Sequence, residues 1–203
     1  KDFRAWLSRQ AMENKANTSR ARALSGVKNL LRWLDKQGIL HNAAISTLKT
    51  PKHGRSLPKP LQVVQALRLI DEMNCEDWGD TRDRALFTLL YGAGLRVDEA
   101  LDLNITDLPR PGQDECIRVR GKGEKQRQVP VLPIVEEHLH SYRNECPYPE
   151  TPARPVFLGK RGKRLNQGVA QRSMRNLRHS TGLPETATPH ALRHSYATHL
   201  LQN

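Results

Sequence analysis

Apolar residues recur every three to four positions along most of the chain, which is the period of an amphipathic helix. The pattern predicts a helix over residues 2–14 and a second helix that Thr18 or Ser19 caps and Gly38 ends. Beyond residue 60, a short helical turn starts near Val97, and longer helices are predicted over 61–70, 81–91, 134–146, 166–181 and 190–202. Most of the chain is therefore expected to be helical.

Strict alternation of apolar and polar residues replaces the helical period in one region. Residues 116–120 and 126–131 alternate like two strands, and the loop Gly-Lys-Gly-Glu-Lys at 121–125 joins them as a hairpin. A short third strand is predicted at Val156–Leu158. The predicted fold class is mainly α with a small β-sheet.

A segment rich in proline and lysine divides the chain into two parts. Residues 51–60 contain three prolines, one glycine and three Lys or Arg residues, which is typical of a linker. We therefore predict a small helical domain over 1–52, a linker over 53–59 and a larger, mostly helical domain with the small sheet over 60–203. Two basic domains on such a joint could close around a duplex as a clamp.

The charge of the chain points to a polyanionic partner. There are 33 Lys and Arg against 21 Asp and Glu, a net charge of +12, and the first 59 residues alone hold 13 basic and 3 acidic residues. Two further basic stretches cover 118–127 and 154–178. Such a surplus of positive charge favours binding to phosphates, because their neutralisation releases counterions. Nucleic acid is therefore the first expected partner and an anionic membrane surface the second. A solvated basic surface remains the plain alternative.

Several classes of protein find little support in the sequence. The three cysteines are far apart without a CxxC pair, which argues against a disulfide framework and favours a reducing compartment. The longest apolar run, Ala85–Leu95, is too short to span a bilayer, and the N-terminus lacks a signal-peptide pattern. Walker A, complete GxGxxG and G-x-S-x-G motifs are also missing. We expect a cytoplasmic protein.

Two short motifs combine residues suited to phosphodiester chemistry. His190 and Arg193 are three apart on the last predicted helix, so they share a face. Arginine can fork onto two phosphate oxygens, while histidine can donate to the phosphate or move a proton. The glycines before Arg96 permit a turn that points its side chain into a cleft, and Glu99 can orient a nearby cation. Ordinary surface residues are the alternative.

A lysine in the hairpin loop and a pair of histidines on the last predicted helix are two further candidates for a functional site. Lys122 lies between two glycines in the hairpin loop, and a lysine near other cations can serve as a general acid; Lys125 competes for that role, and a solvated turn lysine is the alternative. His190 and His194 have the i,i+4 spacing of a zinc site. Without a convincing third ligand, although His199 is near in sequence, no metal is predicted.

Four stretches of the chain together resemble one protein family. SRARALSGVKNLLRWLDKQG, YGAGLRVDEALDL, VRGKGEKQRQVPV and TPHALRHSYATHLL are similar, in this order, to tyrosine recombinases of the phage integrase family, and within it to XerC-like Xer recombinases. The resemblance implies a helical, SAM-like core-binding domain and a catalytic domain that encircle double-stranded DNA as a C-shaped clamp. It also implies a tetramer on two DNA sites, homomeric or shared with a second Xer-type recombinase.

The resemblance assigns roles residue by residue. Arg96 matches the first catalytic arginine, and Lys122 the hairpin lysine that protonates the leaving 5′-hydroxyl. His190 and Arg193 match the family's H-x-x-R pair, and Glu99 matches a supporting acid. The reaction passes through a 3′-phosphotyrosyl bond and needs neither metal nor cofactor. The basic segments add candidate DNA-binding residues, namely Arg20, Arg22, Lys28, Arg118, Arg120, Lys125, Arg127, Arg161, Lys163, Arg164, Arg172 and Arg175.

The chain departs from the family pattern in three ways. The nucleophilic tyrosine is expected beyond the 203 residues, since Tyr196 matches a packing position and Tyr91, Tyr142 and Tyr148 match nothing catalytic. By the same comparison, we expect the first domain to lack its first helix within the 203 residues. Asp98 stands where many members have serine, which adds a negative charge beside Arg96.

The function implied is site-specific DNA recombination. For a Xer-type enzyme, this means resolving chromosome dimers for chromosome partition at cell division in the bacterial cytoplasm, with a DNA translocase. A phage, integron or transposon integrase of the same fold is the alternative within the family. A truncated relative that binds DNA without cutting it is the alternative outside the enzymes, and a zinc-dependent or triad hydrolase has almost no support.

Overall fold

A computed structural model describes residues 2–52, 63–109, 116–121 and 125–200 of the chain. The chain divides into two compact units, Lys1–Leu57 and Pro58–Asn203. The predicted linker, 53–59, lies outside the described residues, so each unit is considered by itself.

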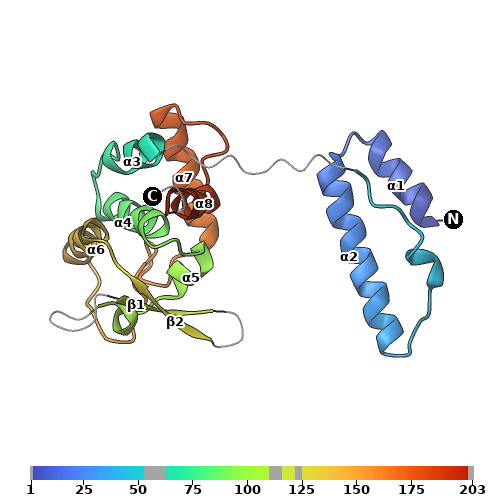
Figure 1. The fold of residues 1–203 in the computed structure, drawn as a ribbon, viewed down its shortest axis with the longest axis horizontal. Coiled ribbons are helices and arrows are strands. Elements are labelled where there is room, and N and C mark those ends of the chain that lie inside the picture. Colours follow the sequence, from blue (N-terminus) through green and yellow to red (C-terminus); the bar gives the residue numbers. More distant parts are fainter. Residues whose placement is uncertain (1, 53–62, 110–115, 122–124, 201–203) are drawn as a thin grey trace. The chain divides into compact units, whose positions relative to one another are not determined.

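Over residues 2–52, the first unit contains two α-helices and a 3-10 helix. They are α1 (Asp2–Met12), α2 (Asn17–Lys36) and η1 (Ala43–Ile45) (Figure 1). A small core of Leu24, Ile45 and Leu48 is completed by partly buried side chains of α1 and α2. The predicted helices are therefore confirmed in this unit.

The start of α2 differs from the sequence prediction. Ala16 is its N-cap and makes no side-chain cap, so the prediction that Thr18 or Ser19 caps it is wrong. Both residues lie inside the first turn, because the helix begins at Asn17, whose side-chain amide donates to the carbonyl of Lys52 over 2.9 Å. The predicted end is confirmed, since Gly38 has the left-handed φ of +69° typical of a helix terminus.

The second unit is mainly helical with a small sheet (Figure 1). Its elements are α3 (Val63–Asp71), α4 (Trp78–Gly92), α5 (Val97–Asp102), η2 (Ile105–Asp107), β1 (Cys116–Arg120), β2 (Gln126–Pro130), α6 (Pro133–Glu145), α7 (Gln167–Thr181) and α8 (Pro189–Leu200). The predicted fold class, mainly α with a small sheet, is confirmed. Among the described helices, none is long and apolar enough to cross a membrane.

The predicted hairpin is present, but the predicted third strand is wrong. β1 and β2 pair antiparallel with Ile117 opposite Val129 and Val119 opposite Arg127. Val156, Phe157 and Leu158 are all fully buried, whereas a strand with one solvent-facing side would alternate. Instead of a ladder, there are two isolated bridges, Asn104 with Pro155 and Leu158 with Arg164, because the backbone hydrogen bonds of this run pass to single residues of different segments.

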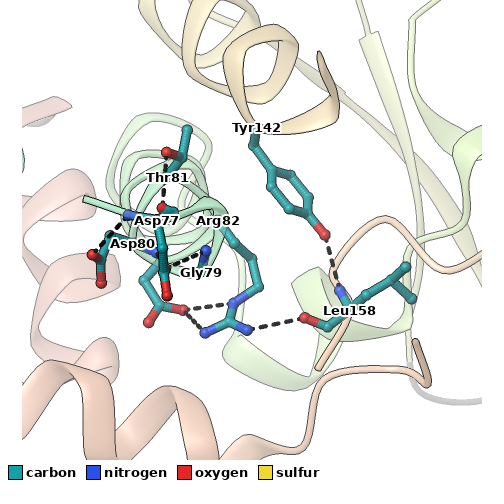
Figure 2. A network of polar contacts seen from close by, with 8 residues as sticks. Asp77, Gly79, Asp80, Thr81, Arg82, Tyr142 and Leu158 are labelled. Carbon is teal, nitrogen blue, oxygen red and sulfur yellow. Dashed lines mark hydrogen bonds and ion pairs between the residues drawn. The ribbon is translucent and has the colours of Figure 1, made fainter. Parts of the chain in front are cut away.

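Helix α4 is the centre of the second unit. It packs against α6 and α8, and consecutive residues from Ala85 to Leu90 are buried, so the helix is covered on all sides. Asp77 starts it with a capping box, accepting from the backbone N–H groups of Gly79 and Asp80 over 2.6 and 3.0 Å (Figure 2). A helix so enclosed supplies a rigid base for the segments that follow it.

The buried Arg82, paired with Asp83 on α4, fixes this helix to the segment before α7. The Arg82 guanidinium donates to the Asp83 carboxylate over 2.7 and 2.8 Å and to the carbonyl of Leu158 over 3.0 Å (Figure 2). The amide N–H of Leu158 in turn donates to the hydroxyl of Tyr142. Burial raises the pKa of Asp83, although Arg82 and Ser173 oppose that rise. Residue 158 is therefore held by both α4 and α6.

Candidate active site

A glycine turn sets the position of Arg96. Helix α4 ends at Gly92, and Gly94 then adopts a φ of +60°, a left-handed conformation that favours glycine. A Cβ at residue 94 would collide with the ring of Tyr196, so the backbone and this ring are in close contact. Arg96 follows as the N-cap residue of α5. The turn expected from the sequence thus places Arg96 beside the start of a new helix.

Glu99 lies at the centre of a cluster of three arginines. Its buried carboxylate, 8% exposed, accepts from the backbone N–H of Arg96 over 2.8 Å and from the Arg96 guanidinium over 2.9 Å. Arg127 of β2 donates to both carboxylate oxygens over 3.0 and 2.9 Å, and Arg193 of α8 donates to one over 3.4 Å. One carboxylate therefore joins residues from α5, β2 and α8.

The cluster keeps a positive charge. Burial opposes the ionisation of Glu99, but the hydrogen bonds from Arg127 and Arg96 outweigh it and lower the pKa of the carboxyl to about 2. The carboxylate is thus ionised at neutral pH and offsets one of the three guanidinium charges. Arg96 and Arg193 remain 61% and 28% exposed, so their side chains can still meet a ligand. Arginine presents several N–H donors in a planar fork, which suits a phosphate group.

A cavity of about 640 Å³ opens beside the cluster. Arg96, His190 and Arg193 line it, and α7 contributes polar side chains to its wall, namely Gln167, Gln171, Arg175 and Arg178. The cavity therefore brings together the two motifs that the sequence indicated separately, and it is bordered by basic and amide groups rather than by acids, apart from Asp98.

His190 shares a hydrogen bond with a second histidine. Its Nε2 lies 3.0 Å from Nε2 of His194, with the two rings edge to face. Partial burial lowers the pKa of His190, and the nearby His194, Arg193 and Arg96 lower it further. These effects favour the neutral imidazole, in which one ring nitrogen donates and the other accepts.

The start of α8 is fixed as the sequence predicts. The Thr188 hydroxyl accepts from the backbone N–H of Ala191 over 3.1 Å, and Pro189 is the first helical residue, so the cap and the first-turn proline are confirmed. The sequence did not reveal that Arg178 donates to the carbonyls of Glu185 and Ala187 over 2.5 and 3.3 Å. This arginine holds the segment that leads into α8 and, through it, His190 and Arg193.

The other candidate residues fall into different settings. Lys122 lies outside the described residues. Arg127 is expected from the sequence only as a DNA contact, but the structure places it in the Glu99 cluster. The sequence around Arg127 gives no signal that Glu99 is its partner. Among the remaining candidates, Arg22, Arg118, Lys125, Arg161, Lys163, Arg172 and Arg175 are exposed.

Besides Arg127, four of the candidate DNA contacts have partners within the chain. Lys28 donates to the carbonyl of Leu48 over 2.7 Å, and Arg20 donates to Asn17. Arg164 donates to the carbonyl of Leu101 over 2.5 Å and to the side chain of Asn104 over 2.7 Å, and Arg120 lies 3.9 Å from Asp107. These side chains contribute to folding, whatever they add to binding.

Among the described residues, which include all four tyrosines, no tyrosine lines the cavity. Tyr196 packs on Gly94, and Tyr142 is buried, where burial raises its pKa. The Tyr148 hydroxyl donates to the carbonyl of Lys160 over 2.7 Å, and Tyr91 packs against the core. Within the described ranges, no group of three His, Cys, Asp or Glu residues could hold a metal ion.

The chain matches known sequences over almost its whole length. Residues 59–203 match the phage integrase family. Similar proteins include the tyrosine recombinase XerC of Rhodospirillum centenum, 50% identical over 98% of this chain and 59% of that protein, and XerC of Agrobacterium fabrum, 45% identical over 98% and 64%. The chain thus spans about three fifths of the length of the curated relatives it matches.

Solved structures show the same fold. XerA recombinase is 26% identical with a TM-score of 0.63, covering all of this chain and 68% of that one. The XerH site-specific recombinase bound to a palindromic difH substrate is 26% identical with a TM-score of 0.70, covering 92% and 55%. The chain therefore belongs to the phage integrase family and is similar to the XerC tyrosine recombinases.

Proposed function

We propose that the chain is part of a Xer-type site-specific recombinase that breaks and rejoins double-stranded DNA. The observation that carries this proposal is the cavity where Arg96, Arg193 and His190 meet, with Glu99 joining the two arginines. Two guanidinium groups and an imidazole facing one cavity suit the binding of a single phosphodiester. The similarity to XerC proteins supports the same function.

The proposed reaction exchanges one phosphodiester for another. A tyrosine oxygen attacks the phosphorus, a 3′-phosphotyrosyl bond forms, and the bond from phosphorus to the 5′-oxygen breaks. Arg96 and Arg193 donate to the non-bridging oxygens, where negative charge increases in the transition state. His190 holds one of these oxygens or moves the tyrosine proton, and Lys122 donates a proton to the leaving 5′-oxygen. The reverse reaction rejoins the strands, so no metal or high-energy cofactor is required.

The tyrosine must reach this cavity from elsewhere. Since all four tyrosines of the chain lie away from the cavity, we expect the nucleophile to come from outside the 203 residues. In the same proposal, the exposed basic residues of both units bind the DNA backbone. The active assembly is a tetramer on two sites with a second Xer-type recombinase, which resolves chromosome dimers in the bacterial cytoplasm with the help of a translocase.

The test measures binding and cleavage separately. We expect the 203-residue chain to bind duplex DNA with an affinity that falls steeply as salt rises, since counterions are released on binding. The intact recombinase is expected to cleave one strand of a nicked duplex and stay attached to it. A salt-independent affinity would contradict the DNA partner, and binding without any attachment would leave a DNA-binding protein that does not cut.

A further inference from the structure

We propose that Arg127 is a positioning residue, which holds the Glu99 carboxylate so that Arg96 and Arg193 stay directed at the DNA phosphate. This inference rests on the proposed function of the cavity. The Arg127 guanidinium donates to both oxygens of Glu99, over 3.0 and 2.9 Å, whereas the Arg96 guanidinium donates to one oxygen and its backbone N–H to the other. Such a two-point contact fixes both the place and the rotation of a carboxylate.

Arg127 contacts the Glu99 carboxylate but does not line the cavity. The cavity is lined by Arg96, His190 and Arg193 but not by Arg127, which borders a separate hollow with the neighbouring strand residues Arg118, Gln126 and Gln128. A direct contact between Arg127 and the phosphate in the cavity is therefore not needed to explain its position. Its effect on the reaction passes through Glu99.

The second role of Arg127 is to supply hydrogen bonds to the buried carboxylate of Glu99. Arg193 reaches the carboxylate over 3.4 Å, the longest of the guanidinium contacts in the cluster. Without Arg127, the buried carboxylate would lack two hydrogen bonds and would draw Arg193 toward it. An arginine pulled onto Glu99 has fewer donors for a phosphate. Arg127 thus leaves Arg193 available to the substrate.

Arg127 also ties the hairpin to the cluster. It lies on β2 opposite Val119, and Glu99 lies on α5, so the contact joins two elements through residues that are 28 positions apart. Of the interactions that keep Glu99 ionised, the hydrogen bond from Arg127 is the largest. Loss of Arg127 is therefore expected to raise the pKa of Glu99, because burial raises this pKa and fewer hydrogen bonds would then lower it.

The test uses three variants. Arg127→Gln removes the contact, and Arg127→Lys keeps the charge with a single point of contact. Arg143→Gln is the matched control, since Arg143 makes a similar two-point pair with Glu150 over 2.9 and 2.5 Å, away from the cavity. In the 203-residue chain, the side-chain carboxyl resonance of Glu99 is followed by NMR against pH. In the intact recombinase, single-turnover cleavage per bound DNA is followed from pH 5 to 8.

The expected results are specific to the Glu99 contact. We expect the midpoint of the Glu99 titration to rise by about 1–3 pH units in Arg127→Gln and to stay unchanged in Arg143→Gln. Cleavage per bound DNA falls by roughly 100-fold in Arg127→Gln, the size expected for misplaced catalytic groups. Arg127→Lys recovers part of the rate, and Arg143→Gln cleaves like the wild type.

Two results would overturn the inference. One is an unchanged Glu99 titration in Arg127→Gln, since the contact would then not govern the carboxylate. The other is a shifted titration with wild-type cleavage at every pH, since the contact would then not matter for the reaction. Absence of cleavage in the wild type itself would instead refute the proposed function, and the reaction role of Arg127 with it.

Discussion

The ring of Tyr196 lies against the backbone of Gly94, at the point where a Cβ would stand. Tyr196 belongs to α8, which also carries His190 and Arg193, while Gly94 begins the turn that leads to Arg96. This contact therefore sets the distance between the two arginine-bearing segments. It also gives Tyr196 a packing role, as expected from the sequence.

Gly94→Ala tests this contact. Alanine must adopt a φ of +60° and its Cβ must displace the Tyr196 ring, so we expect the free energy of unfolding to fall by roughly 2–4 kcal/mol. Gly182→Ala is the control, because Gly182 has a φ of +66° with nothing within 4 Å of its Cβ position. We expect the control to lose only about 1 kcal/mol. Urea denaturation measures both, and equal losses would exclude a collision at residue 94.

Removal of either cavity arginine is expected to separate binding from cleavage. In Arg96→Ala and Arg193→Ala, cleavage per bound DNA falls at least about 100-fold, because stabilisation of the transition-state charge is lost. Affinity for duplex DNA falls little, and the slope of log affinity against log salt concentration becomes shallower by about 1, the share of one phosphate contact. Anisotropy titrations and single-turnover cleavage measure the two effects. A variant that loses binding but cleaves normally once bound would reverse the assignment.

Glu99 is expected to make stability depend on acid pH. Its pKa in the folded chain is about 2, below the ordinary 4.5, so the stabilisation is present above pH 4.5 and disappears as pH falls toward 2. By this linkage, Glu99→Gln loses ~3 kcal/mol of unfolding free energy at pH 7. The difference between variant and wild type narrows between pH 4.5 and 2. Denaturant titrations at pH 7, 5, 4 and 3 measure it, and a gap independent of pH would contradict the linkage.

The buried pair Arg82–Asp83 gives a prediction about folding alone. The two side chains are 5% and 8% exposed, so Arg82→Met leaves a buried carboxylate without its cation. We expect a loss of about 3–5 kcal/mol in unfolding free energy. The double variant Arg82→Met/Asp83→Leu removes both charges and is expected to regain most of this loss. Chemical denaturation of the wild type and the two variants measures their free energies of unfolding. A double variant as unstable as Arg82→Met would contradict the prediction, since the loss would then come from altered packing and not from the unpaired carboxylate.

Local patterns predicted most of the fold. The strands β1 and β2, the break at Gly92–Gly94 and the cap at Thr188 each depend on residues close in sequence, and the structure confirms them. The failures have physical causes. Val156–Leu158 looks like a strand because it is apolar, but it is buried through contacts with several segments and not through a ladder.

The site itself was only partly visible in the sequence. Glycines before Arg96 and the H-x-x-R spacing mark residues that chemistry requires, so these could be singled out. The pairing of Arg127 with Glu99 depends on how the hairpin packs beside α5, and Arg178 donates to backbone carbonyls of the loop between α7 and α8. Contacts of this kind come from tertiary packing, which leaves no periodic trace in the sequence.

The covalent trapping of DNA tests the central claim most directly. The intact recombinase is incubated with a nicked duplex that loses its free 5′-hydroxyl strand on cleavage, and the attached residue is mapped by mass spectrometry. We predict a 3′-phosphotyrosyl adduct on a tyrosine other than Tyr91, Tyr142, Tyr148 and Tyr196, and its disappearance in Arg193→Ala. An adduct on one of these four tyrosines, or one that forms equally well in Arg193→Ala, would contradict the account.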